Sequence, residues 1–145
     1  LESLGIESKQ LVFLRQAHSA RVLSLDRHSP VNSSSQGVVP ADGVITMGPN
    51  QFPVVRTADC LPILIIIPNR GQVCALHAGW RGTRDRITGK GAKQLMELSK
   101  VKPQELLVAI GPSIRRCCYQ VGPEVLDQYT RAGHDVDRVF AEDEA

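Results

Sequence analysis

The chain has 145 residues, of which 42% are hydrophobic and 22% charged, and its formal net charge is +2. This balance is that of a globular protein with enough residues for one sizeable core, which excludes a disordered or fibrous chain. The basic residues are scattered, so we expect no nucleic acid and no membrane as a partner. The longest apolar run, residues 61–67, contains a proline and is too short to span a bilayer.

The four cysteines are too few for a disulfide scaffold. Cys117 and Cys118 are adjacent, a poor arrangement for an ordinary bridge between them. We therefore expect a reducing, cytoplasmic compartment, and we assign Cys74, Cys117 and Cys118 to packing. The chain starts without methionine and stops soon after a new apolar pair, so we expect an incomplete copy of a longer domain.

Apolar and β-branched segments predict most of the secondary structure. They predict strands at 11–14, 21–25, 42–46, 53–56, 62–67, 73–77 and 106–110. The segments 53–56 and 62–67 show no alternation with polar residues, so these strands are expected to be covered on both faces. The segment 106–110 predicts a buried strand. Residues 28–40 hold serines, a glycine and prolines, which is typical of a surface loop.

The clearest predicted helix covers residues 83–100, with Thr83 as its N-cap. Gly89 and Gly91 each weaken its middle by about 1 kcal/mol relative to alanine. Its apolar stripe is formed by Ile87, Leu95 and Leu98.

A second helix begins at Pro123 and is closed by Gly133, because proline suits the first helical position and glycine the end. Strands outnumber helices and their connections are mixed. We therefore predict an α/β or α+β fold, a single domain over residues 1–145 with a mixed β-sheet and flanking helices.

Three segments each place a metal-binding side chain just beyond an apolar strand: His18, Cys60 and His77. Two imidazoles and one thiolate form a set that catalytic zinc uses, with the fourth tetrahedral position left for water or substrate. Zinc there would stabilise negative charge on an oxygen. The alternative from the residues alone is that Cys60 is a small buried hydrophobe and both histidines are ordinary core or surface residues.

Six blocks of the sequence occur in the order found in the YfiH family, which the chain resembles over nearly its whole length. This family was formerly called multicopper polyphenol oxidase or laccase-domain, and its members are described as purine nucleoside phosphorylases. The blocks are Gln-Ala-His at 16–18, Ala-Asp-Gly-Val-Ile-Thr at 41–46, Thr-Ala-Asp-Cys-Leu-Pro at 57–62, His-Ala-Gly-Trp-Arg-Gly at 77–82, Ile-Gly-Pro-Ser-Ile at 110–114 and Cys-Tyr-Gln-Val-Gly-Pro-Glu-Val at 118–125.

The resemblance implies a YfiH-like domain, cut short at its C-terminal end, that binds Zn²⁺ through His18, Cys60 and His77. It implies phosphorolysis of adenosine, inosine or methylthioadenosine, with deamination of adenosine as a second activity. Two residues depart from the family pattern: Ala17 and Ser19 stand where the family usually has valine and glycine.

Five further residues are candidate substrate contacts. Arg81 precedes the predicted long helix, whose N-terminus favours an anion, so it is the first candidate phosphate ligand and Arg56 the second. Trp80 is a candidate for stacking on a base or ribose. Asp42 is a candidate hydrogen-bond partner of the ribose, and Asp59 could orient a ligand histidine. The alternatives are surface ion pairs for the arginines, core packing for Trp80 and turn formation for the aspartates.

Two other functions would use the same side chains. Cys60 and His77 could form the nucleophile–base pair of a cysteine hydrolase or deamidase, although a zinc-bound thiolate is poorly placed as a free nucleophile. The chain could also be a non-catalytic binding module stabilised by zinc. A multicopper oxidase is excluded by its histidine content, because 4 histidines cannot supply a cluster bound largely by imidazole.

Overall fold

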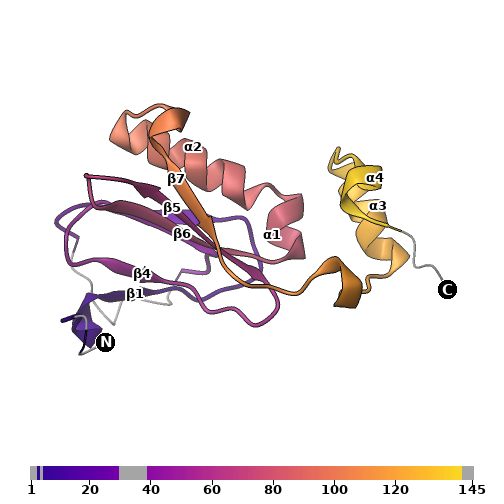
Figure 1. The fold of residues 1–145 in the computed structure, drawn as a ribbon, viewed down its shortest axis with the longest axis horizontal. Helices are drawn as coiled ribbons and strands as arrows, with labels where there is room; N and C mark the ends of the chain where they lie inside the picture. Colours follow the sequence, from indigo (N-terminus) through magenta and orange to yellow (C-terminus); the bar gives the residue numbers. More distant parts are fainter. Residues whose placement is uncertain (1–2, 4, 30–38, 142–145) are drawn as a thin grey trace. The chain divides into compact units, whose positions relative to one another are not determined.

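The computed structural model describes residues 3, 5–29 and 39–141. The chain divides into two compact units, Leu1–Ser113 and Ile114–Ala145. The first unit contains the β-sheets and the second is helical (Figure 1). Most of the predicted surface loop at 28–40 lies outside the described residues.

A five-stranded mixed sheet forms the centre of the first unit, in the order β2-β3-β6-β5-β7. Its strands are β2 (Val22–Leu25), β3 (Gly43–Thr46), β5 (Leu61–Ile67), β6 (Gln72–Ala78) and β7 (Leu107–Ile110). Strands β2 and β3 are parallel and the other neighbours are antiparallel. Two short strands, β1 (Leu11–Phe13) and β4 (Phe52–Val54), pair in parallel apart from this sheet. This mixed sheet with helices beside it confirms the predicted fold class.

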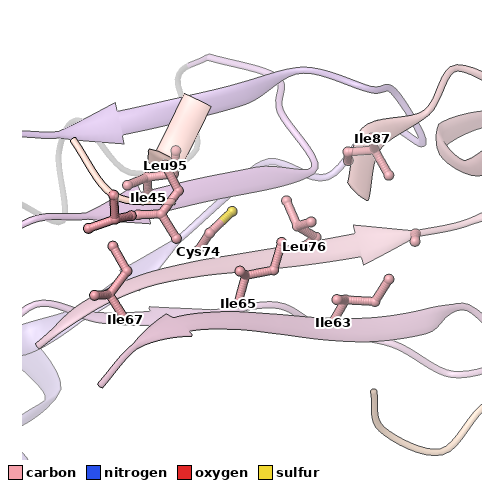
Figure 2. Packing of buried hydrophobic residues seen from close by; sticks show 10 residues of the cluster. Ile45, Ile63, Ile65, Ile67, Cys74, Leu76, Ile87 and Leu95 are labelled. Carbon is pink, nitrogen blue, oxygen red and sulfur yellow. The ribbon is translucent and has the colours of Figure 1, made fainter. Parts of the chain in front are cut away.

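The core lies between the sheet and helix α2 (Ile87–Ser99), which packs against β6 and β3 (Figures 1 and 2). The main buried side chains are Ile45, Ile63, Ile65, Ile67, Cys74, Leu76, Ile87 and Leu95. Burial raises the pKa of the Cys74 thiol to about 12. This thiol is therefore protonated and inert at neutral pH, as expected of a packing residue.

Two strands predicted to be buried are covered less than expected. Along β5, Ile63, Ile65 and Ile67 are buried, whereas Leu64 on the opposite face is 37% exposed. All residues of β7 are exposed, because this strand lies at the edge of the sheet with β5 as its neighbour. An apolar run without alternation indicates that both faces of a strand can be buried. It does not show whether another strand or helix covers each face.

The predicted helix over 83–100 is two helices, α1 (Trp80–Arg84) and α2. The chain turns between them at Arg86, whose φ of 61° lies in the left-handed region. Gly79 is the N-cap of α1, so the prediction of Thr83 as an N-cap is wrong, since Thr83 is already inside α1.

The apolar stripe on α2 is also shorter than predicted. Ile87 and Leu95 are buried as expected, but Leu98 is 45% exposed near the C-terminal end of the helix. None of the helices in the described parts of the chain is long and apolar enough to cross a membrane.

In the second unit, α3 (Pro123–Arg131) starts at the predicted proline and is followed by α4 (Val136–Val139). The ring of Tyr129 is buried in this unit and meets the Phe140 ring at a centroid distance of 5.1 Å. Cys117 and Cys118 are exposed, so the prediction that they serve packing is wrong.

Gly89 and Gly91 form a matched pair for testing the packing of α2. A Cβ atom on Gly91 would lie 3.0 Å from Cys74 Sγ and 3.0 Å from Leu76 Cδ2, whereas one on Gly89 would meet nothing within 4 Å. We expect Gly91→Ala to lower the free energy of unfolding by about 1–3 kcal/mol through overpacking. Gly89→Ala should raise it by about 0.5–1 kcal/mol through helix propensity. Urea unfolding measures both, and equal stabilisation by the two variants would contradict the close packing at Gly91.

Candidate metal centre

The side chains of His18, Cys60 and His77 converge, although they come from three separate segments. One ligand atom from each residue lies within 4.8 Å of the other two. His77 lies near the end of β6, and Cys60 immediately precedes β5. These strands are antiparallel neighbours with Leu61 paired to Ala78, which brings Cys60 next to His77. The sequence predicted this convergence, and the role of the three side chains as metal ligands stays a prediction.

The three ligands differ in exposure. His77 is 4% exposed on its strand, Cys60 is half-buried and His18 is exposed on a loop. The rings of His18 and His77 meet edge to face, with centroids 4.8 Å apart. The candidate centre therefore has one rigidly held ligand and a side that is open to solvent.

Asp42 connects the two histidines through one fully buried carboxylate. Its Oδ1 accepts hydrogen bonds from Nδ1 of His77 at 2.8 Å and from the backbone N–H of His18 at 3.0 Å. Its Oδ2 accepts hydrogen bonds from the N–H of Ala17 at 3.2 Å and from Ser19, whose N–H lies at 2.6 Å and hydroxyl at 2.7 Å. Successive N–H groups that enclose a carboxylate in this way are an anion-binding arrangement. The loop carrying His18 is thereby fixed to the strand carrying His77.

The carboxylate also determines which nitrogen of His77 can bind a metal. Burial opposes ionisation of Asp42, but the hydrogen bonds from Ser19, His77 and the backbone outweigh it and bring the pKa of the carboxyl below its usual value. An ionised carboxylate accepts the proton on Nδ1 of His77. Since a neutral imidazole has one donor and one acceptor nitrogen, Nε2 of His77 is left as the acceptor that a metal ion requires.

His18 adopts a strained backbone conformation, with φ at 55°. The left-handed region costs a residue with a side chain roughly 1 kcal/mol or more. The hydrogen bonds from this loop to Asp42 offset that cost. We infer that His18 points toward His77 because the carboxylate holds its loop in this form.

The Cys60 thiol is poorly ionised in the absence of a cation. Burial raises its pKa, and the nearby negative charges of Asp59 and Asp42 raise it further. A bound cation has the opposite effect on a neighbouring thiol and deprotonates it. The electrostatics of the site therefore favour a thiolate at Cys60 only when a metal ion is present.

Two glycines of the His-Ala-Gly-Trp-Arg-Gly segment are needed for close approach. A Cβ atom on Gly79 would lie 3.0 Å from Cys60 Sγ and 3.1 Å from His18 Cδ2. A Cβ atom on Gly82 would lie 2.9 Å from the carbonyl oxygen of Ser19. A side chain at Gly82 would therefore require the backbone at Ser19 to shift, and one at Gly79 would require the Cys60 and His18 side chains to move by a few tenths of an ångström.

Gln16 joins two ligand-bearing segments, and the sequence analysis gave it no role. Its Nε2 donates to the carbonyl oxygen of Arg56 at 2.7 Å, and its Oε1 accepts from the N–H of Arg56 at 2.7 Å. These two bonds align the segment that leads to His18 with the segment that leads to Cys60. The family block that contains Gln16 was the available signal, but the partner of a glutamine cannot be read from sequence.

The remaining predicted residues surround the centre in other roles. The carboxylate of Asp42 is enclosed, so it does not fit the ribose contact that we expected. Asp42 orients His77 instead, the role that we had assigned to Asp59. The side chain of Asp59 is exposed. The guanidinium of Arg81 lies 4.2 Å from the centroid of the Trp80 ring, and that of Arg84 lies 5.8 Å from it. Arg81 lies inside the short helix α1. The long helix that we expected to begin just after Arg81, and whose N-terminus was to favour an anion, therefore does not begin there.

The whole chain, residues 1–145, matches the family described as multi-copper polyphenol oxidoreductase laccase, and it belongs to that family. It is similar to a purine nucleoside phosphorylase of Haemophilus influenzae, with 35% identity over 132 residues that cover 91% of this chain and 50% of that protein. It is also similar to the adenosine deaminase RL5 of an unknown prokaryotic organism, with 32% identity over 145 residues, covering 98% and 55% of the two chains.

Two solved structures share the fold. The YfiH protein of Bacillus licheniformis superposes with a TM-score of 0.86 and 27% identity, over 97% of this chain and 54% of that chain. YlmD of Geobacillus stearothermophilus has a TM-score of 0.78 and 31% identity, over 88% and 48% of the two chains. The resemblance to the YfiH family is confirmed, and the chain spans about half the length of these relatives.

Asp42→Asn tests whether the carboxylate organises the site. The amide would oppose backbone N–H groups with its own N–H group and would remove the charge that they enclose. We expect the free energy of unfolding to fall by about 3 kcal/mol and the affinity for Zn²⁺ to fall about 10–100-fold. Asp59→Asn is the exposed control and should change stability by less than about 0.5 kcal/mol. Chelator competition and urea unfolding measure the two quantities, and wild-type zinc affinity in Asp42→Asn would contradict the assignment.

Proposed function

We propose that the complete protein is a zinc-dependent purine nucleoside phosphorylase. Its substrates would be phosphate and adenosine, inosine or methylthioadenosine, and it would also deaminate adenosine. The observation that carries this proposal is the convergence of two histidines and a cysteine within 4.8 Å. Relatives named for purine nucleoside phosphorolysis and for adenosine deamination support it.

The donor set suits zinc. Two imidazole nitrogens and one sulfur leave a fourth tetrahedral position for substrate or water. Ligand atoms around one tetrahedral zinc ion lie about 3.5 Å apart. The ligand atoms of His18, Cys60 and His77 lie up to 4.8 Å apart, so they must move closer to bind one ion. Rotation of the exposed His18 and half-buried Cys60 side chains would close this difference, while the buried His77 stays in place.

Bound zinc would supply a Lewis acid that stabilises negative charge on a substrate oxygen. The chain's own residues would position the ligands and the substrates. Asp42 holds the proton on Nδ1 of His77 and keeps the imidazole in one orientation. Phosphate would form a bond to the anomeric carbon as the bond from that carbon to the purine nitrogen breaks.

Arg81 is the proposed phosphate contact, with Arg56 as the second candidate. A guanidinium binds phosphate oxygens through paired hydrogen bonds, and both side chains are exposed on segments that border the centre. Because the guanidinium of Arg81 lies over the Trp80 ring, we assign Trp80 to positioning Arg81 and no longer to stacking on the base. Asp59, exposed next to Cys60, stays a candidate contact of the substrate.

A cysteine hydrolase or deamidase is the second candidate, favoured by one observation. Asp42 orients His77 as an acidic residue orients the base of a catalytic triad, and a ligand atom of His77 lies within 4.8 Å of Cys60 Sγ. The raised pKa of the Cys60 thiol counts against it, because that residue would be mostly protonated without a cation.

Metal removal distinguishes these functions. In the complete protein, a chelator should abolish release of adenine and ribose 1-phosphate from adenosine and phosphate, and added Zn²⁺ should restore it. Cys60→Ser should weaken zinc binding by at least about tenfold and lower the rate in parallel, because a hydroxyl is a poorer ligand than a thiolate. Cys118→Ser, which removes an exposed thiol, is the control and should retain both properties.

A cysteine hydrolase would show the opposite pattern. It would keep its activity in chelator, lose it on alkylation and form a covalent intermediate on Cys60. Zinc binding without turnover would instead favour the binding module. Phosphorolysis of adenosine by a demonstrably metal-free preparation would contradict the proposed function.

A further inference from the structure

Cys117 and Cys118 place two sulfur atoms 3.2 Å apart on the second unit. Both side chains are exposed, and both belong to the short 3-10 helix Arg116–Cys118. Successive side chains of an extended strand point to opposite faces, so the helical turn is what brings these two thiols together. Among the described residues, neither the hydrophobic core clusters nor the candidate metal centre includes them.

An ordinary disulfide does not account for the pair. Adjacent Cα atoms are about 3.8 Å apart across a trans peptide bond, and the described residues contain no cis peptide. A disulfide usually joins Cα atoms about 4.4–6.8 Å apart, so a bond here would be strained and easily reduced. The pair therefore persists as two neighbouring thiols.

The spacing of the sulfurs is also narrow for a divalent cation. Two thiolates on a tetrahedral zinc ion, each with a bond of about 2.3 Å, lie about 3.8 Å apart. A pyramidal atom with narrower bond angles, such as trivalent arsenic, brings its two sulfurs closer together. The observed 3.2 Å fits the second geometry better.

The surrounding charge points the same way. Arg115 and Arg116 directly precede the pair, and both side chains are exposed. Their positive charge repels a divalent cation but does not oppose a neutral arsenical. The hydrogen bond with Cys117 raises the pKa of Cys118, so Cys118 stays a thiol at neutral pH and its proton is available for a condensation.

We propose that Cys117 and Cys118 form a bidentate binding site for a neutral trivalent arsenical. An arsenic–oxygen double bond and two S–H groups are converted into two arsenic–sulfur bonds and one molecule of water, with no oxidant or reductant. Once the first bond forms, the second thiol is already in contact, so ring closure is intramolecular. Cys60, the other partly accessible thiol, has no second thiol beside it among the described residues and can form one such bond.

The test is intact-mass analysis of the full chain treated with phenylarsine oxide. We expect one adduct per chain, heavier by the reagent minus one water, that survives excess 2-mercaptoethanol and is removed by dithiothreitol. Cys117→Ser and Cys118→Ser should each weaken the adduct on the order of a hundredfold by removing ring closure, and Cys60→Ser should leave it unchanged. Absence of the adduct in the wild type, its persistence in Cys118→Ser, or its reversal by 2-mercaptoethanol would each overturn the proposal.

Discussion

The buried carboxylate of Asp42 is the interaction on which the candidate centre depends. It receives three successive backbone N–H groups from residues 17–19, the Ser19 hydroxyl and Nδ1 of His77. The backbone carbonyl oxygen of Asp42 also accepts a hydrogen bond from the backbone N–H of His77 at 2.7 Å. Both the backbone and the side chain of Asp42 therefore hold the strand that carries His77. Without the carboxylate, the loop would lose what keeps His18 in the left-handed region, and the His77 ring would be free to turn.

A buried negative charge is costly unless hydrogen bonds or a cation compensate it. Here the hydrogen bonds make Asp42 a stable anion. Burial raises the pKa of the Cys60 thiol, and the negative charges of Asp59 and Asp42 raise it further. The centre is therefore unfavourable for a free thiolate and favourable for a cation that neutralises both groups. This is the physical reason for preferring a metal site over a cysteine nucleophile, and it depends on charges that the chain itself supplies.

The sequence predicted every strand of the main sheet with its ends displaced by at most one residue, and it predicted the three side chains that converge as candidate ligands. It assigned the orienting carboxylate to Asp59, the neighbour of Cys60 along the chain, and it gave Asp42 the ribose contact. The pairing of Gly43 with Leu76 places Asp42 opposite His77, and strand register cannot be read from composition. The break at Arg86 was missed for a related reason, since its left-handed turn has no glycine or proline to mark it.

X-ray absorption at the zinc edge of the complete, zinc-loaded protein tests the central claim most directly. The account predicts one zinc ion per chain with one sulfur at about 2.3 Å and two imidazole nitrogens at about 2.0–2.1 Å. The sulfur signal should disappear in Cys60→Ser and persist in Cys118→Ser. A stoichiometric zinc ion without sulfur in its coordination shell, or one whose sulfur signal survives in Cys60→Ser, would contradict the account.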